Sequence, residues 1–195
     1  FFQDKPVERL LGEGIDARHL NDDLLGRTLD AIFQYAPTML YSQLAAQAVS
    51  RLGVLCRFGH LDATSFHVDG EYNSAVAPAE DSRVIHITPG YSRDHRPDLN
   101  QVVLQLIAER QAGIPLLMEP LGGNNSDKTS FRETVKAHVD QLNREVGLEY
   151  LIADSALYTA ETLSEMNGFY WITRVPETLE LARFLIHATA PELMR

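Results

Sequence analysis

The stretch of sequence that decides the fold is Phe58-Gly-His-Leu-Asp-Ala-Thr-Ser-Phe-His-Val68. It is rich in β-branched and aromatic residues, which fit a pleated and half-buried surface, so it predicts a β-strand. A second apolar stretch, Tyr150-Leu-Ile-Ala-Asp154, predicts a shorter buried strand. One aspartate interrupts the first apolar run and another ends the second. These two strands therefore determine where Asp62 and Asp154 lie.

The sequence between these two strands predicts further strands. Residues 69–82 are typical of an exposed loop, residues 84–88 of a short strand, and residues 90–97 of a polar turn. Residues 101–109 fit a helical stripe, but they also fit a strand that closes a hairpin onto residues 114–119. Periodicity alone does not decide between the two.

The remainder of the chain is more regular. Ser126 is expected to cap a long amphipathic helix that ends at Gly147, with Phe131, Val135, Val139 and Leu142 on one face. Thr159 is expected to cap a short helix, and residues 169–175 and 177–188 predict a strand and a further helix. The order is three strands, helix, strand, helix, strand, which is typical of an α/β fold.

Residues 1–57 predict a small helical segment in front of a main domain at 58–195. Asn21 is expected to cap a first helix, and Pro37 suits the first turn of a second helix that stops at Gly53. A pair of helices with a tight turn is compatible with a helix-turn-helix. The second helix carries few cations, so a helical prefix packed on the main domain is favoured.

Composition limits the function classes. The chain has 195 residues, 45% of them hydrophobic, and a formal net charge of −10. This charge is the wrong sign for a domain that holds nucleic acid by its phosphates alone. Cys56 is the single cysteine, so no internal disulfide forms, as fits a reducing compartment. No apolar run approaches the roughly 20 residues that span a bilayer. We expect a cytoplasmic protein without a membrane partner.

Asp62 and Asp154 are the candidate catalytic residues. Aspartate is depleted in strands, and a buried carboxylate without a partner is costly. If the two strands are neighbours in the sheet, both carboxylates are expected in one cleft, where hard oxygen ligands suit Mg²⁺ or Mn²⁺. The simpler alternative is that one aspartate pairs with an arginine or caps the helix after its strand. Spacing alone leaves both alternatives open.

The other polar residues carry weaker signals. Glu119 ends a strand, where a solvated position at the rim of the cleft is expected. The histidines, among them His60 and His67, show no metal-ligand spacing. Residues 122–125 predict a turn and not a phosphate-binding loop, because no Gly-Lys-Ser/Thr ending follows. Ser65 and Ser155 have no base at a fixed spacing, which argues against a serine hydrolase.

Five blocks of the sequence, in consistent order, resemble those of a group of bacterial insertion-sequence transposases of the DDE type. The blocks are residues 12–30, 60–66, 90–103, 113–129 and 150–156. The resemblance implies a ribonuclease H-like mixed sheet, with residues 101–109 as a strand. It also implies that Asp62 and Asp154 are the first two metal-binding carboxylates, that Mg²⁺ or Mn²⁺ is the cofactor, and that DNA is the partner. The full-length proteins often act as dimers.

The resemblance further implies strand cleavage and strand transfer of a mobile element. Water, and then a 3′-hydroxyl, attacks a phosphodiester without a covalent enzyme intermediate. The family's third carboxylate is a Glu within a Tyr…Arg…Glu…Lys signature, and Glu177, Glu180 and Glu192 lack those neighbours. We therefore expect a fragment that is inactive by itself.

Two other functions are compatible with the sequence. The first is a degenerate or domesticated remnant without catalytic activity. The second is a Mg²⁺-dependent phosphohydrolase in which Asp62 is the nucleophile. Such enzymes normally carry a second aspartate two residues on, where this chain has Thr64.

Overall fold

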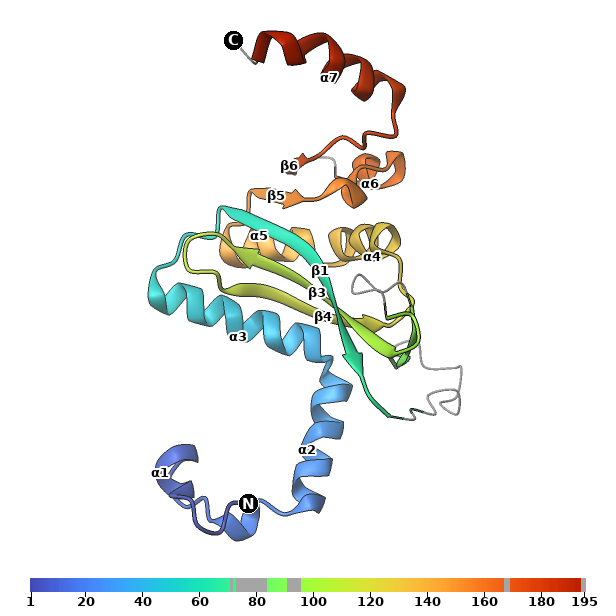
Figure 1. Ribbon diagram of the computed structural model, residues 1–195. Coiled ribbons are helices and arrows are strands. Elements are labelled where there is room, and N and C mark those ends of the chain that lie inside the picture. Colours follow the sequence, from blue (N-terminus) through green and yellow to red (C-terminus); the bar gives the residue numbers. More distant parts are fainter. Residues whose placement is uncertain (71, 73–83, 91–95, 167–168, 194–195) are drawn as a thin grey trace. The chain divides into compact units, whose positions relative to one another are not determined.

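A computed structural model describes residues 1–70, 72, 84–90, 96–166 and 169–193 (Figure 1). The chain forms two compact units, Phe1–Leu40 and Tyr41–Arg195, which are described separately. The division into functional segments at residue 57 stays a prediction. Most of the expected loop at 69–82 and the centre of the expected turn at 90–97 lie outside the described residues.

The first unit consists of short helical elements. They are α1 (Val7–Leu11), the 3₁₀ helix η1 (Ala17–His19) and α2 (Asp22–Tyr35). Asn21 caps α2 as predicted, since its side chain accepts a hydrogen bond of 2.8 Å from the backbone N–H of Leu24. Neither α1 nor η1 was predicted, because each is too short to show a helical period.

Helix α3 (Pro37–Leu52) begins in the first unit and continues into the second. It starts at Pro37 and stops before Gly53, whose φ of 65° is in the left-handed region, so both predicted boundaries are confirmed. Within the second unit, the Tyr41 hydroxyl donates a hydrogen bond of 3.2 Å to the carbonyl of Pro115. This contact fastens α3 to the first residue of a strand.

The second unit is built on one mixed sheet. Its strands are β1 (Phe58–Val68), β2 (Thr88–Pro89), β3 (Asn100–Glu109), β4 (Pro115–Gly122), β5 (Tyr150–Ala153) and β6 (Tyr170–Thr173). β3 runs antiparallel to β1 on one side and to β4 and β2 on the other, whereas β5 is parallel to β1 and β6 is parallel to β5 (Figure 1). The predicted α/β class is confirmed: antiparallel β1, β3 and β4, with the two-residue β2, precede the alternating helices and strands.

Two strand expectations have different outcomes. Residues 101–109 form a strand, as the resemblance implied. The strand expected at 84–88 is wrong, because only Thr88 and Pro89 pair with the sheet. These two residues pair with Gln101 and Asn100, and β4 occupies the same edge of β3 from Val102 onward. The edge is therefore too short for a longer β2.

One helical run connects β4 to β5. It consists of α4 (Asp127–Thr134), the π-helix η3 (Val135–Val139) and α5 (Asp140–Val146), and Gly147 follows it in the left-handed conformation. The predicted end at Gly147 is confirmed. Ser126 occupies the N-cap position, but its side chain makes no capping hydrogen bond, so that part of the prediction is wrong.

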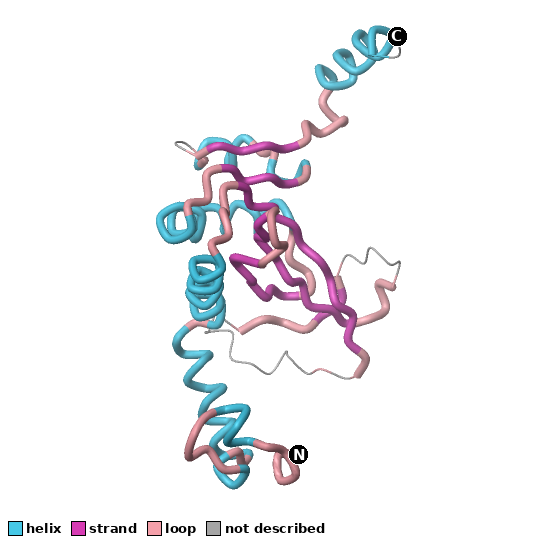
Figure 2. Tube along the Cα trace, turned by 90° about the vertical axis from the view of Figure 1, so that its left-hand side faces the viewer, coloured by secondary structure: helices cyan, strands magenta, loops and turns pink. Residues whose placement is uncertain are grey.

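The core lies between the sheet and this helical run, which covers one face of the strands (Figures 1 and 2). The predicted helix face is buried, together with residues from four strands: Phe131, Val135, Val139, Leu142, Leu61, Ile107, Leu117 and Leu151. Gly59 permits the side chains of Leu148 and Ile107 to pack directly against the backbone of β1. A Cβ there would lie 2.8 Å from Leu148 Cδ1 and 2.9 Å from Ile107 Cγ2.

Shorter elements complete the unit. They are the 3₁₀ helix η4 (Ser155–Leu157), α6 (Ala160–Glu165) and α7 (Glu180–Leu193). Thr159 caps α6 as predicted, because its hydroxyl accepts a hydrogen bond of 3.1 Å from the backbone N–H of Thr162. No helix of the described part of the chain has both the length and the apolarity needed to cross a bilayer.

A buried carboxylate organises the β3–β4 hairpin. Glu109 is 2% exposed, and its side chain accepts hydrogen bonds of 2.6–2.9 Å from the backbone N–H groups of Gln111, Ala112 and Ile114. Burial raises the pKa of Glu109, but these backbone hydrogen bonds oppose it, and the net pKa lies below the usual value. The hairpin thus depends on the ionised form of Glu109.

We predict that Glu109→Gln lowers the free energy of unfolding by about 1–3 kcal/mol at pH 7, because the amide replaces a charged acceptor of several N–H groups. Since the folded pKa is lowered, this stabilisation is present above the unfolded value of 4.5 and is lost as the pH falls through the folded pKa. Urea titrations followed by circular dichroism at several pH values measure it. The control is Glu133→Gln, an exposed position. If the loss of unfolding free energy caused by Glu109→Gln stayed the same at acid pH, the prediction would be contradicted.

Candidate active site

Asp62 and Asp154 occupy equivalent positions on neighbouring parallel strands. β1 and β5 pair from Phe58↔Tyr150 to Leu61↔Ala153, and each aspartate is the next residue after the last pair. The two strands are therefore neighbours in the sheet, as the prediction of a shared carboxylate site required. The pairing with β5 ends at Leu61, whereas the pairing of β1 with β3 continues to Val68.

The two aspartates face different surroundings: Asp62 lies on the face of β1 away from the core, whereas Asp154 lines a cavity together with Ala63 and Val103. Leu61 and Ala63 are both buried, so the side chain of Asp62 between them in the extended strand faces the opposite way. Asp62 and Asp154 are both exposed. We expected buried carboxylates from the sequence, and that expectation is wrong. Strand alternation explains Asp62, and Asp154 is exposed because β5 has already ended.

Each carboxylate is engaged through one oxygen. Oδ1 of Asp62 accepts a hydrogen bond of 2.8 Å from the backbone N–H of Ala63, and Oδ1 of Asp154 accepts one of 2.9 Å from that of Ala156. Asp154 thereby caps η4, which is one of the simpler alternatives considered for it. Neither aspartate forms an ion pair within the part of the chain that the structure describes.

These carboxylates fit part of a hard-cation site. Each has a second oxygen without a hydrogen bond to a described residue, and carboxylate oxygens are the ligands that Mg²⁺ and Mn²⁺ prefer. Among the described residues, however, no group of three or more Asp, Glu, His or Cys side chains is placed to hold a metal ion. The donor set suits the metal, but it consists of two carboxylates.

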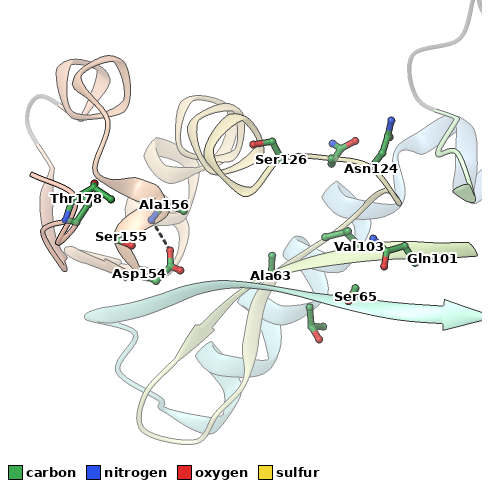
Figure 3. A pocket seen from close by; sticks show the side chains of 13 residues that line it. Ala63, Ser65, Gln101, Val103, Asn124, Ser126, Asp154, Ser155, Ala156 and Thr178 are labelled. Carbon is green, nitrogen blue, oxygen red and sulfur yellow. Dashed lines mark hydrogen bonds between the residues drawn. The ribbon is translucent and has the colours of Figure 1, made fainter. Parts of the chain in front are cut away.

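A cavity of about 700 Å³ adjoins the end of β5 (Figure 3). Asp154 lines it and Asp62 does not. The other lining residues come from the middle of β1, from β3, from the loop before α4, and from the segments that follow β5 and β6: Ala63, Thr64, Ser65, Gln101, Val103, Asn124, Asn125, Ser126, Ser155, Ala156, Pro176 and Thr178. The structure thus gathers neutral amide and hydroxyl groups beside one of the two aspartates.

The sequence did not reveal this polar lining. Gln101 lies in an apolar run, yet it is buried and donates a hydrogen bond of 2.6 Å to the carbonyl of Gly123. Residues 122–125 form a turn as expected, and a Cβ at Gly123 would collide with the carbonyls of Gln101 and Thr88. Only a glycine permits the turn to lie this close to β3.

Glu119 differs from its expected place at a solvated rim. It is half-buried and accepts a hydrogen bond of 2.6 Å from the Thr134 hydroxyl. Thr134 in turn contacts the buried amide of Gln105. Glu119 therefore belongs to a polar contact between β4, β3 and α4, and it is not a lining residue of the cavity.

Comparisons with known proteins give limited matches. A family model described as a domain of unknown function matches residues 1–46. No curated protein matches the chain. Among solved structures, the Mos1 transposase paired-end complex with left transposon end is 12% identical, with a TM-score of 0.39, and the match covers 93% of this chain. The chain spans 55% of the length of that protein.

A second similar structure is the catalytic domain of Mos1 mariner transposase. It is 9% identical, with a TM-score of 0.38, and the match covers 77% of this chain and 68% of that domain. The Mos1 strand transfer complex is 13% identical, with a TM-score of 0.34, and the match covers 77% of this chain and 46% of that protein. At these values the similarity assigns no activity to the chain.

We predict that Asp154→Ala lowers the free energy of unfolding by about 0.5–2 kcal/mol, because it removes the cap of η4. Asp154→Asn keeps an oxygen that accepts from the Ala156 N–H, so its stability is expected to stay near that of the unmodified chain. Thermal and urea denaturation measure both variants. Equal losses for Ala and Asn would show that the cap is not the stabilising contact.

Proposed function

We propose that this chain is part of the catalytic domain of a DDE-type insertion-sequence transposase, with Asp62 and Asp154 as metal ligands. The observation that carries the proposal is their placement. Each aspartate directly follows the last residue pair, Leu61↔Ala153, of two neighbouring parallel strands. The five sequence blocks and the order of the sheet support the same function.

The chemistry follows from the carboxylates. A divalent cation held there would polarise a phosphodiester and lower the pKa of bound water. Asp154 is oriented by its hydrogen bond to Ala156 and Asp62 by its hydrogen bond to Ala63, so each presents a second oxygen in a restrained direction. In the proposed reaction, water cleaves the DNA strand at the element end and releases a 3′-hydroxyl, which then attacks target DNA and displaces a new 3′-hydroxyl.

DNA is the proposed partner, and the parent protein is proposed to act as a dimer in the cytoplasm. With a net charge of −10 and two carboxylates, the chain repels phosphates unless cations are bound. Two carboxylates also hold metal more weakly than three. We therefore propose that residues 1–195 alone cleave DNA poorly or not at all.

We predict weak Mn²⁺ binding, with a dissociation constant on the order of 1 mM, that depends on both aspartates. Asp62→Asn and Asp154→Asn should each weaken it about tenfold, because each removes a charged ligand. Electron paramagnetic resonance of free Mn²⁺ measures the binding, and paramagnetic broadening of NMR signals locates it. The matched control is Asp140→Asn, an exposed aspartate of α5. Binding that survives both variants would refute the shared site.

We also predict no Mg²⁺-dependent nicking of a supercoiled plasmid that carries the element ends by residues 1–195. Gel electrophoresis separates the nicked and supercoiled forms. Nicking by the chain that disappears in Asp62→Asn would support the proposed ligands and contradict the proposed inactivity. Nicking that persists in that variant would reveal a contaminating nuclease.

A further inference from the structure

The cavity beside Asp154 is lined almost entirely by neutral groups. Eight of the lining residues have a hydroxyl or amide side chain: Thr64, Ser65, Gln101, Asn124, Asn125, Ser126, Ser155 and Thr178. Asp154 is the single charged residue of the described lining, which contains no Lys or Arg. An anion placed in the cavity would therefore meet a carboxylate and no described cation.

The chemistry of the lining selects for a neutral polar ligand. Hydroxyl and amide groups both donate and accept hydrogen bonds, as the edges of nucleobases and the oxygens of deoxyribose do. Ala63 of β1 and Val103 of β3, which are adjacent strands, form an apolar part of the lining (Figure 3). A volume of about 700 Å³ is ample for one nucleoside.

We infer that this cavity holds the neutral nucleoside part of a DNA residue, with the adjoining phosphate outside it at the Asp154 end. The inference rests on the proposed function, because the proposed metal site defines which phosphate lies at that end. Asn125, in the loop before α4, and Thr178, after β6, both line the cavity and are assigned to contact the nucleoside.

A nucleoside in this cavity cannot remain stacked within a duplex. A base that enters the cavity is unstacked from its neighbours, because the cavity is bounded by β1 and β3 on one side and by the loop before α4 on another. Unstacking costs least at a strand end or in single-stranded DNA. The cavity is thus assigned to a terminal or unpaired nucleotide and not to a residue within a continuous duplex.

NMR titration of the isotope-labelled 195-residue chain tests the inference with three probes: deoxyadenosine, deoxyadenosine 5′-monophosphate and inorganic phosphate. Deoxyadenosine is expected to shift the Asn125 side-chain amide and the Ala63 methyl signals, with a dissociation constant on the order of 1 mM. Inorganic phosphate is expected to leave these signals unchanged. Asn125→Ala and Thr178→Val should each weaken deoxyadenosine binding about fivefold, which corresponds to the loss of one hydrogen bond.

The matched control is Gln47→Ala, which removes an exposed amide of α3 outside the cavity and should leave deoxyadenosine binding unchanged. Backbone spectra of each variant report whether it is folded, and Ser126→Ala provides a second cavity variant if one is not. The inference is overturned if phosphate shifts the same signals as strongly, if deoxyadenosine shifts other regions, or if no shift occurs. Mn²⁺ titration of the same samples tests the proposed metal site independently of nucleoside binding. If the chain binds deoxyadenosine but not Mn²⁺, the proposed function is contradicted and the inference about the cavity is not.

Discussion

The short parallel ladder between β1 and β5 is the constraint on which the rest of the site depends. It joins Phe58–Leu61 to Tyr150–Ala153 and then stops, while β1 continues beside β3 to Val68. Because β5 stops early, the next residue, Asp154, is released to cap η4, and Asp62 stands at the equivalent point of β1. The same early end leaves room for the cavity beyond β5. The position of the carboxylates and the shape of the cavity thus have one cause.

The core maintains this ladder from one side. The helical run between β4 and β5 packs Phe131 and Leu142 against the sheet, and Gly59 allows Leu148 to approach within contact distance of β1. At the start of β4, Leu116 and Leu117 are both fully buried in this core, where the pairing of β4 with β3 shifts register. The aspartates lie where this coverage ends, and their exposure avoids the desolvation cost that burial would impose.

Sequence patterns predicted the elements that have a clear period. The stripe from Phe131 to Leu142 gave the long helix, and the apolar run at Tyr150–Ala153 gave β5. The patterns failed where tertiary contacts replace local chemistry. The buried face of β3 carries three polar residues, Gln101, Gln105 and Glu109. The two glutamines donate to backbone carbonyls more than 20 residues away, and Glu109 accepts from the turn that follows it, so no local period reveals their burial. The cavity lining was invisible for the same reason, since it joins five separate segments.

The acidity of the chain links the metal and DNA contacts. Two carboxylates on a chain of net charge −10 repel a phosphodiester, and a bound cation reverses that interaction locally. By thermodynamic linkage, if a bound cation strengthens DNA binding, bound DNA strengthens cation binding by the same free energy. A weak site of two carboxylates then gains affinity when a phosphate supplies further oxygen ligands. The neutral lining of the cavity fits this arrangement, because it adds hydrogen bonds for a nucleoside while the charges are balanced at the Asp154 end alone.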